Sequence, residues 1–325
     1  MNKRRILWAD YLRCLCILLI IASHVLGTDE IWKQLLFGFN VPCLVILSGY
    51  LSVESSGSSL KQYYWKRAKR LLFPTWVFFA VYFILIGIVS IDSSYPYSLT
   101  QIVKTFLFMD GIGYTWILAI FVMIAIFTPI YKVMVNKIER INLVALILYW
   151  ILGLTLFLVP GKNIIVKLMM YASGYIFLSF FGYCYESYKS KTVILLGGGI
   201  TEILLGFYIR FALNGNAFDF SAQKYPPTIY YVIYGLVAFI ILKEVFSFLS
   251  CKTQLSQVNM LVEKVSKISF DLYLWHIFAL YLSRNVSNRT MRLFAVILLS
   301  FAFAIIYRLI KSKISESMNH KEKNR

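Results

Sequence analysis

Long apolar stretches recur along the chain, and polar or charged residues separate them. Ten of these stretches hold about 17–23 residues, the length at which a helix crosses roughly 30 Å of hydrocarbon. They do not alternate apolar and polar residues, as the strands of a membrane barrel would. The pattern therefore predicts an all-α fold, a polytopic membrane helical bundle of about ten transmembrane helices. The predicted spans are 6–27, 32–53, 71–91, 114–135, 141–160, 165–185, 192–212, 228–249, 268–285 and 290–310.

The connections between spans are short, with three exceptions. Segments 92–113 and 213–227 are expected outside the membrane. The first contains a short amphipathic stretch, and the second is rich in aromatic residues and turn formers. Segment 250–267 is expected to be an amphipathic linker on the cytoplasmic membrane surface. We expect one transmembrane domain over residues 1–312, followed by a charged cytoplasmic tail over 313–325.

The composition excludes most soluble classes of protein. Of the 325 residues, 59% are hydrophobic and only 15% are charged, whereas a soluble protein carries about 25% charged residues. A soluble globular enzyme, a disordered chain and a disulfide scaffold are all excluded. The five cysteines are odd in number and lack metal-site spacing, so we expect them to serve as apolar filler and expect no metal site.

The charge distribution predicts the orientation in the membrane. The net charge is +18. With the N-terminus inside, 23 of the 33 basic residues fall in cytoplasmic segments, nine fall outside, and Arg13 lies within the first span. This bias predicts cytoplasmic N- and C-termini in a multi-pass protein of the plasma (inner) membrane. It also accounts for the charge without a nucleic-acid partner.

One polar stripe runs along the first span, DYLRCLCILLIIASHV. Arg13 and His24 are eleven residues apart, which is about 1100° of helical rotation, or three turns plus about 20°. They therefore share a face, about 16 Å apart along the axis, and Asp10 lies close enough to pair with Arg13. Ionisable groups within a span tend to face a cavity. The alternative is a snorkelling arginine plus a histidine that bonds a neighbouring helix.

Two further groups of residues have both a structural and a functional interpretation. In the second span, Asn40 and Pro42 interrupt the helix, and Ser48-Gly49 permits close packing of backbones. Before the third span, Arg67 and Arg70 share a helix face at the cytoplasmic surface. They could bind a polyphosphate or serve only as a topogenic cluster.

Three more ionisable residues lie within predicted spans. Asp271 and His276 are five residues apart, about 140° around a helix, so they need not act together. Glu202 lies in the seventh span. Each acid is either a functional group or a structural hydrogen-bond partner.

Taken together, these residues resemble acyltransferase family 3, the integral-membrane O-acyltransferases that modify bacterial surface carbohydrates. The resemblance covers nearly the whole chain. In length and layout the chain is most similar to stand-alone sugar O-acetyltransferases of surface-antigen pathways. The matching elements are Arg13 and His24 with ten residues between them, Ser48-Gly49-Tyr50, Arg67-x-x-Arg70, Tyr114-Thr115-Trp116, and SFDLYLWH ending at His276.

The resemblance implies transfer of an acyl group, most often acetyl, from cytoplasmic acyl-CoA to a hydroxyl of a cell-surface or lipid-linked sugar. Acetyl-CoA would be a co-substrate, and no bound cofactor is implied. His24 would act as general base or carry the acyl group transiently, Arg13 would hold the donor, and Asp10 would orient Arg13. The other implied site residues are Arg67, Arg70, Ser48 and Gly49 for acyl-CoA, and Trp116, Tyr114, His276, Glu202 and Asp271 for the tunnel or acceptor.

The expected partners are acyl-CoA, a sugar or polysaccharide acceptor, and the lipid bilayer. Aromatic residues of the outer segments could stack on a sugar ring or form an interfacial belt; they are Tyr95, Tyr97, Phe218, Phe220 and Tyr225. Two other classes of protein also fit ten spans with buried charges. One is a transporter or flippase of a glycan precursor, and the other is a non-catalytic membrane scaffold.

Overall fold

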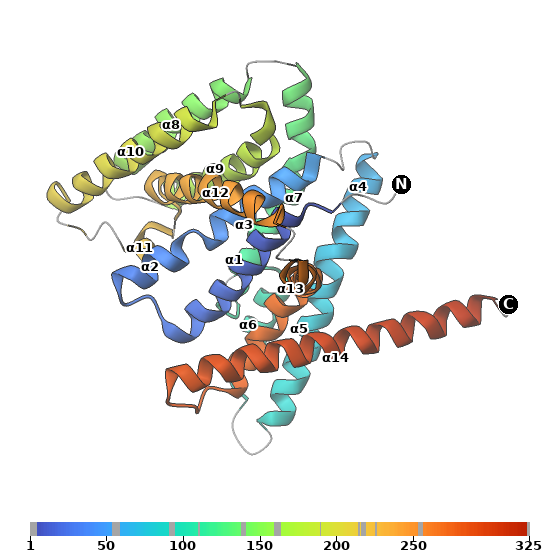
Figure 1. Cartoon of the computed structure of the whole chain (residues 1–325). Coiled ribbons are helices and arrows are strands. Elements are labelled where there is room, and N and C mark those ends of the chain that lie inside the picture. Colours follow the sequence, from blue (N-terminus) through green and yellow to red (C-terminus); the bar gives the residue numbers. More distant parts are fainter. Residues whose placement is uncertain are drawn as a thin grey trace. The chain divides into compact units, whose positions relative to one another are not determined.

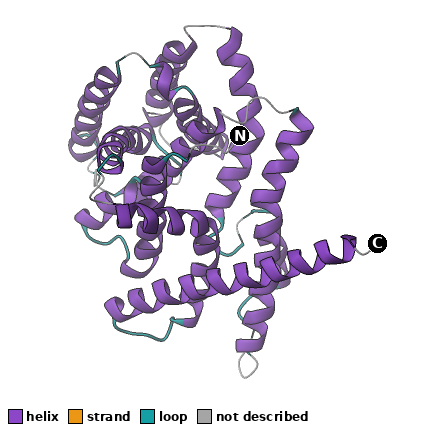
Figure 2. Ribbon diagram, turned by 45° about the vertical axis from the view of Figure 1, so that its right-hand side comes forward, coloured by secondary structure: helices purple, strands orange, loops and turns teal. Residues whose placement is uncertain are grey.

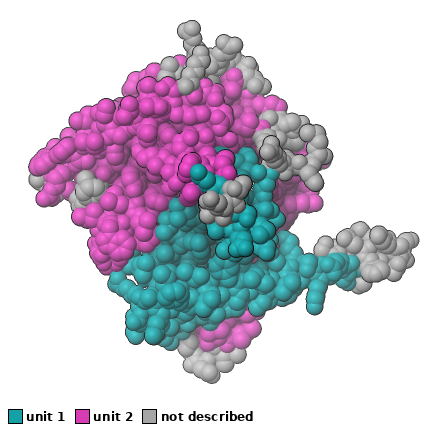
Figure 3. All heavy atoms as spheres, in the orientation of Figure 1, with its two compact units in different colours: residues 1–27, 252–325 teal, residues 28–251 magenta. Residues whose placement is uncertain are grey.

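The computed structural model describes most of the chain as two compact units. The described residues are 5–53, 59–90, 95–109, 111–137, 141–158, 164–188, 190–213, 215, 219–224, 226–252 and 256–323. Unit 1 combines residues 1–27 with 252–325, and unit 2 comprises 28–251. The two units are coloured separately in Figure 3.

The described residues form helices and no strands, as Figures 1 and 2 show. This confirms the predicted all-α fold. Unit 1 contains α1 (Leu7–Leu26), α13 (Ser256–Leu282) and α14 (Arg289–Lys323). Unit 2 contains α2 (Ile31–Gly38), α3 (Asn40–Ser52), α4 (Leu60–Arg67), η2 (Ala68–Leu72), α5 (Phe73–Val89), α6 (Leu99–Phe106), α7 (Trp116–Lys137), α8 (Ile141–Leu158), α9 (Ile164–Tyr183), η3 (Tyr185–Ser187), α10 (Lys191–Phe211), α11 (Phe220–Lys224) and α12 (Ile229–Ser250).

Each of the ten predicted spans coincides with a helix or, in the second span, with two helices. Among the described residues, seven helices are long and apolar enough to cross a membrane. These seven are Leu7–Leu26, Ile31–Ser52, Leu60–Val89, Trp116–Val135, Lys191–Phe211, Ile229–Ser250 and Arg289–Ile314. The chain is therefore a polytopic membrane protein, and its orientation in the membrane stays a prediction.

Three helices extend past the predicted ends of their spans. The third span was expected to begin at residue 71, but its helix starts at Leu60 and is continuous through η2 to Val89. Most of the expected linker over 250–267 is not a separate segment, because α13 begins at Ser256 and continues into the ninth span; its place at the membrane surface stays a prediction. Helix α14 does not end near residue 312 but runs on to Lys323.

In unit 1, α1 and α13 lie side by side and run in the same direction. The Tyr11 hydroxyl donates to Asn259 Oδ1 at 2.7 Å, and further along both helices the His24 ring stacks on His276. Successive spans of a multi-pass protein cross the membrane in alternating directions, so the first and the ninth run the same way. The parallel packing of α1 and α13 agrees with this expectation. Helix α14 then returns antiparallel to α13, where Trp275 packs on Phe303.

In unit 2, the second span is broken where the sequence predicted an interruption. Helix α2 ends at Gly38 and α3 begins at Asn40. The short α11 is held against this break, because Phe220 N–H donates to Gln34 Oε1 at 2.7 Å. The Phe220 ring also stacks on Tyr234 with centroids 4.5 Å apart. Part of the outer segment 213–227 is thus folded onto the bundle.

The cysteines offer a direct test of the predicted orientation. Cys251 is exposed at the end of α12, and the other four cysteines are buried. We expect a membrane-impermeant maleimide to label the protein only after the cells are permeabilised, because Cys251 is predicted to face the cytoplasm. Mass spectrometry would locate the label, and Cys251→Ser should abolish it. Labelling of Cys251 in intact cells would show that the predicted orientation in the membrane is wrong.

Candidate functional site

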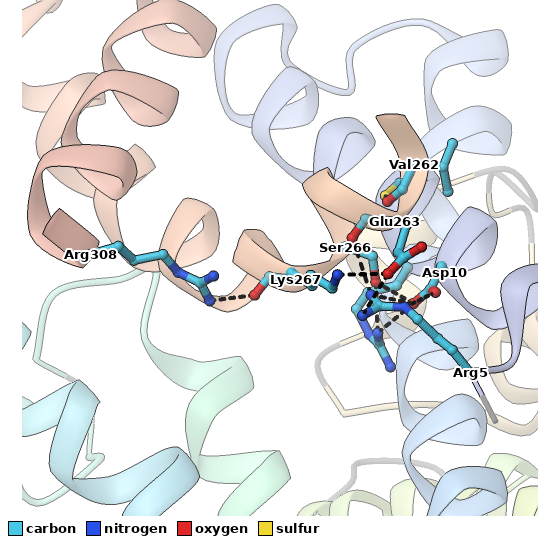
Figure 4. A network of polar contacts seen from close by, with 9 residues as sticks. Arg5, Asp10, Val262, Glu263, Ser266, Lys267 and Arg308 are labelled. Atoms are coloured by element: carbon cyan, nitrogen blue, oxygen red, sulfur yellow. Dashed lines mark hydrogen bonds and ion pairs between the residues drawn. The ribbon is translucent and has the colours of Figure 1, made fainter. Parts of the chain in front are cut away.

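Asp10 is the centre of a buried polar network in unit 1, shown in Figure 4. Its side chain is only 4% exposed. Ser266 Oγ on α13 donates to Asp10 Oδ1 at 2.6 Å. Arg5 Nε donates to Asp10 Oδ2 at 2.5 Å, and Arg5 Nη2 also donates to the backbone oxygen of Glu263 at 3.1 Å. One carboxylate therefore ties the start of α1 to α13.

Arg13 completes this network, as its spacing from Asp10 predicted. Its Nη1 donates to Asp10 Oδ1 at 3.2 Å and to Ser266 Oγ at 2.7 Å. The Arg13 side chain is 29% exposed, whereas Asp10 is almost fully buried. The carboxylate thus acts as an internal anchor for an arginine side chain that is partly exposed. Removing one partner of a buried charge pair costs about 3–5 kcal/mol because the remaining charge is left uncompensated, so a change at one member of this network is also expected to weaken the fold.

His24 lies three helical turns further along α1, in contact with His276 of α13. The two imidazole rings stack with centroids 5.4 Å apart and an interplanar angle of 13°. His24 is partly exposed, and His276 is fully buried. His276 Nδ1 also contacts the backbone oxygen of Tyr273. The structure therefore brings together His24 and His276, which lie 252 positions apart in the sequence.

Asp271 does not join this histidine pair. Arg308 Nε on α14 donates to Asp271 Oδ2 at 2.5 Å, and Arg308 Nη2 donates to the backbone oxygen of Lys267. This ion pair fastens α14 to α13 (Figure 4 shows the contact between Arg308 and Lys267). Of the two interpretations left open for Asp271, its contacts favour the structural one.

Arg67 and Arg70 lie at a π-helical turn in unit 2. Arg67 ends α4, and Arg70 lies within η2, which closes i→i+5 hydrogen bonds. A π-turn holds more residues than an α-turn, so residues three apart diverge more than on the regular helix face expected from the sequence. Arg67 is half-buried, over the Tyr63 ring at 5.3 Å, while Arg70 is exposed. Within the described part of the chain, no carboxylate pairs with either guanidinium.

Gly49 is a packing residue between α3 and α9. A Cβ atom at Gly49 would lie 1.8 Å from the backbone oxygen of Ser179. Gly182 is its counterpart on α9, where a Cβ atom would lie 1.9 Å from the backbone oxygen of Ile46. Two glycines thus let the two backbones touch, which is the packing interpretation of Ser48-Gly49. Any contact of Ser48 or Gly49 with acyl-CoA stays a prediction.

Trp116 begins α7 and is covered by a residue that sequence reasoning missed. Lys224 Nζ of α11 lies 4.6 Å from the centroid of the Trp116 ring, a cation–π distance. Burial lowers the pKa of Lys224 to about 8. No local signal marked Lys224, because only the folding of α11 brings it to α7. Tyr114 is 37% exposed, just before α7.

Glu202 lies on α10 with both carboxyl oxygens buried. No described residue is within hydrogen-bonding geometry of either oxygen, although Tyr230 of α12 is close enough to interact with the carboxyl group. These contacts do not decide between the functional and the structural interpretation that the sequence left open for Glu202. Its role in a tunnel or acceptor site stays a prediction.

The aromatic residues of the outer segments differ in their exposure. Phe220 is 3% exposed, so it is neither a sugar-stacking surface nor part of an interfacial belt. Tyr95 is 40% exposed. The Tyr97 hydroxyl bonds the Tyr82 hydroxyl at 2.7 Å. The other two candidates, Phe218 and Tyr225, lie outside the described residues.

Comparison with known proteins gives one match. The family described as Acyltransferase domain (Acyl_transf_3) matches residues 6–310, which is nearly the whole chain. No curated protein and no solved structure matches the chain significantly. The matched region includes every site residue that was predicted from the sequence.

The glycine contact between α3 and α9 can be tested by adding a methyl group. We expect Gly49→Ala and Gly182→Ala each to destabilise the protein by about 1–3 kcal/mol, because the Cβ atom would collide with backbone. Thermal unfolding in detergent, followed by size-exclusion chromatography, measures this effect. Gly197→Ala is the matched control, because its Cβ would meet nothing within 4 Å. Equal melting temperatures for all three variants and the wild type would refute the packing role.

Proposed function

The chain belongs to the acyltransferase domain family, and we propose that it is an acyl-CoA-dependent O-acyltransferase of the cell membrane. The proposed reaction moves an acyl group, acetyl in the first instance, to a hydroxyl of a cell-surface or lipid-linked sugar. The observation that carries this proposal is the arrangement on α1. A partly exposed guanidinium, anchored by a buried carboxylate, shares one continuous helix with a partly exposed imidazole.

His24 is proposed to act as general base. Its imidazole accepts the proton of the acceptor hydroxyl as the hydroxyl oxygen attacks the thioester carbonyl carbon. The new C–O bond forms, the C–S bond breaks, and the CoA thiolate takes the proton back from the imidazolium. An imidazole can both accept a proton and return it near neutral pH.

Arg13 is proposed to hold the donor. The contacts of its Nη1 with Asp10 and Ser266 fix the guanidinium before any ligand arrives. A preorganised cation can stabilise negative charge that develops on a thioester oxygen, or it can bind a polar group of the pantetheine arm. Asp10 would support this role by orienting Arg13 and by balancing its charge.

Arg67 and Arg70 are proposed to bind the phosphates of the donor. Three observations support this role: the absence of described carboxylate partners, the exposure of Arg70, and the π-turn between the two residues. π-turns are frequent at functional sites. Planar guanidinium groups bind phosphate bidentately. The charge bias predicts that this helix end faces the cytoplasm, where acyl-CoA is found.

The catalytic assignment is tested with purified protein, acetyl-CoA and a panel of candidate glycans. We expect His24→Ala to lower the rate of thiol release by about 10²–10⁴-fold, the range for loss of a general base. Arg13→Ala should also lower the rate, with a rise in KM for acetyl-CoA. A thiol-reactive dye measures CoA release, and mass spectrometry of the glycan identifies the acylated sugar.

His320→Ala is the control for the catalytic assignment, because His320 lies beyond the matched region 6–310. Wild-type rates in His24→Ala or Arg13→Ala would refute the roles of these residues. Absence of acetyl-CoA cleavage by the wild-type protein with every glycan would refute the proposed function. A transporter or a scaffold would give this last result.

The phosphate-binding role is tested by changing both the residue and the donor. We expect the wild-type protein to prefer acetyl-CoA to 3′-dephospho-acetyl-CoA. In Arg70→Gln this preference should fall about 10-fold, which corresponds to about 1.4 kcal/mol. Arg70→Lys should recover only part of the loss, because lysine cannot bind phosphate bidentately. Lys104→Gln, on the predicted outer segment, is the control. An unchanged donor preference in both Arg67→Gln and Arg70→Gln would exclude this role.

A further inference from the structure

His276 occupies an interior position that makes it a support for the His24 ring. It is 0% exposed, and its ring contacts two other rings. One is His24, at 5.4 Å and 13°, and the other is Tyr273, at 5.2 Å and 49°. The ring of His24 thus lies nearly parallel to that of a fully buried neighbour, with the two rings displaced from one another.

The contact with Tyr273 also determines where His276 carries its proton. The acceptor at Nδ1 is a backbone carbonyl oxygen, which has no hydrogen to donate. Nδ1 must therefore carry the hydrogen, and in the neutral ring Nε2 holds the lone pair. This bond lies within α13 itself, so the plane of the His276 ring is set by the helix that carries it.

The stacked geometry has two consequences for His24. First, a ring packed against a fixed parallel plane loses most of its freedom to rotate about χ2, so its nitrogens point in constant directions. Second, the π-face of a neutral aromatic ring attracts a cation. An imidazolium formed at His24 would therefore be stabilised by a neutral His276, and a second positive charge on His276 would oppose it.

We propose that His276 is a positioning residue that holds the His24 imidazole through the contact between their nearly parallel rings and stabilises its protonated form during acyl transfer. This inference rests on the proposed function, because it assigns His24 the role of base. His276 itself does not contact the reacting atoms. What matters in this role is an aromatic ring at this position, while the hydrogen bond to Tyr273 serves to orient that ring.

Two substitutions test the contribution of the His276 ring and that of its hydrogen bond separately. His276→Phe keeps a flat ring and loses the bond to Tyr273, whereas His276→Asn keeps a donor and loses the ring. We expect His276→Phe to retain kcat within about 3-fold and His276→Asn to lose about 10- to 100-fold, the range for a misplaced catalytic group. The KM for acetyl-CoA should stay unchanged in both variants, because His276 does not bind the donor.

Trp275→Phe is the matched control at the neighbouring position, where the ring packs on Phe303 and Tyr307 of α14. It should retain wild-type kcat. Rates are divided by the folded fraction, measured as the monodisperse peak in size-exclusion chromatography, so that a loss of folding is not read as a loss of catalysis. His276→Tyr is a second ring-retaining variant and should behave like His276→Phe.

The outcomes separate this inference from the proposed function. Wild-type kcat in His276→Asn, or equal losses in the Asn, Phe and Tyr variants, would overturn the stacking role while leaving His24 as base. Loss of kcat in the Asn variant alone supports the inference. A wild-type protein that does not cleave acetyl-CoA, or a fully active His24→Ala variant, would instead overturn the proposed function.

Discussion

A charged side chain inside a membrane protein is costly unless a group beside it balances its charge. In unit 1, the packing of α1 against α13 depends on how this requirement is met at Asp10. Its carboxylate takes hydrogen bonds from Arg5, Arg13 and Ser266. These bonds fix the register of α1 against α13. From Arg13 to His24 the chain rises about 16 Å, and from Ser266 to His276 about 15 Å. Because the two helices are parallel, a register set at Asp10 places both histidines at the same level.

The features that sequence could predict are those contained within one helix. The shared face of Arg13 and His24 follows from helical rotation alone, and α1 is continuous through both residues. Their partners could not be predicted, because Ser266 and His276 come from a helix some 250 positions away. Asp271 illustrates the same limit. The sequence allowed a functional or a structural acid, and only the position of Arg308 on α14 favours the second.

The errors in helix boundaries have a common physical cause. The length of an apolar stretch is set by the thickness of the hydrocarbon core of the bilayer. The length of a helix is not, because a helix continues as long as each added residue gains a backbone hydrogen bond. Helix α14 has 35 residues and is about 52 Å long, well beyond the roughly 30 Å of the bilayer core. Helix α13 likewise begins before its apolar part. Its polar first turns supply Glu263 and Ser266 to the Asp10 network, so the extension positions the candidate site.

The aromatic outer segment of unit 2 shows why residue type alone does not identify a recognition surface. A helix of five residues is too short to be stable by itself, and α11 is held by burying Phe220 against Tyr234 and by the Gln34 bond. Its aromatic residue therefore serves folding, and the folded segment presents Lys224 to Trp116. With a pKa of about 8, Lys224 stays about ten to one protonated at pH 7. A cation held on an indole face thus arises from burial of a phenylalanine for which the sequence left open a sugar-stacking or an interfacial role.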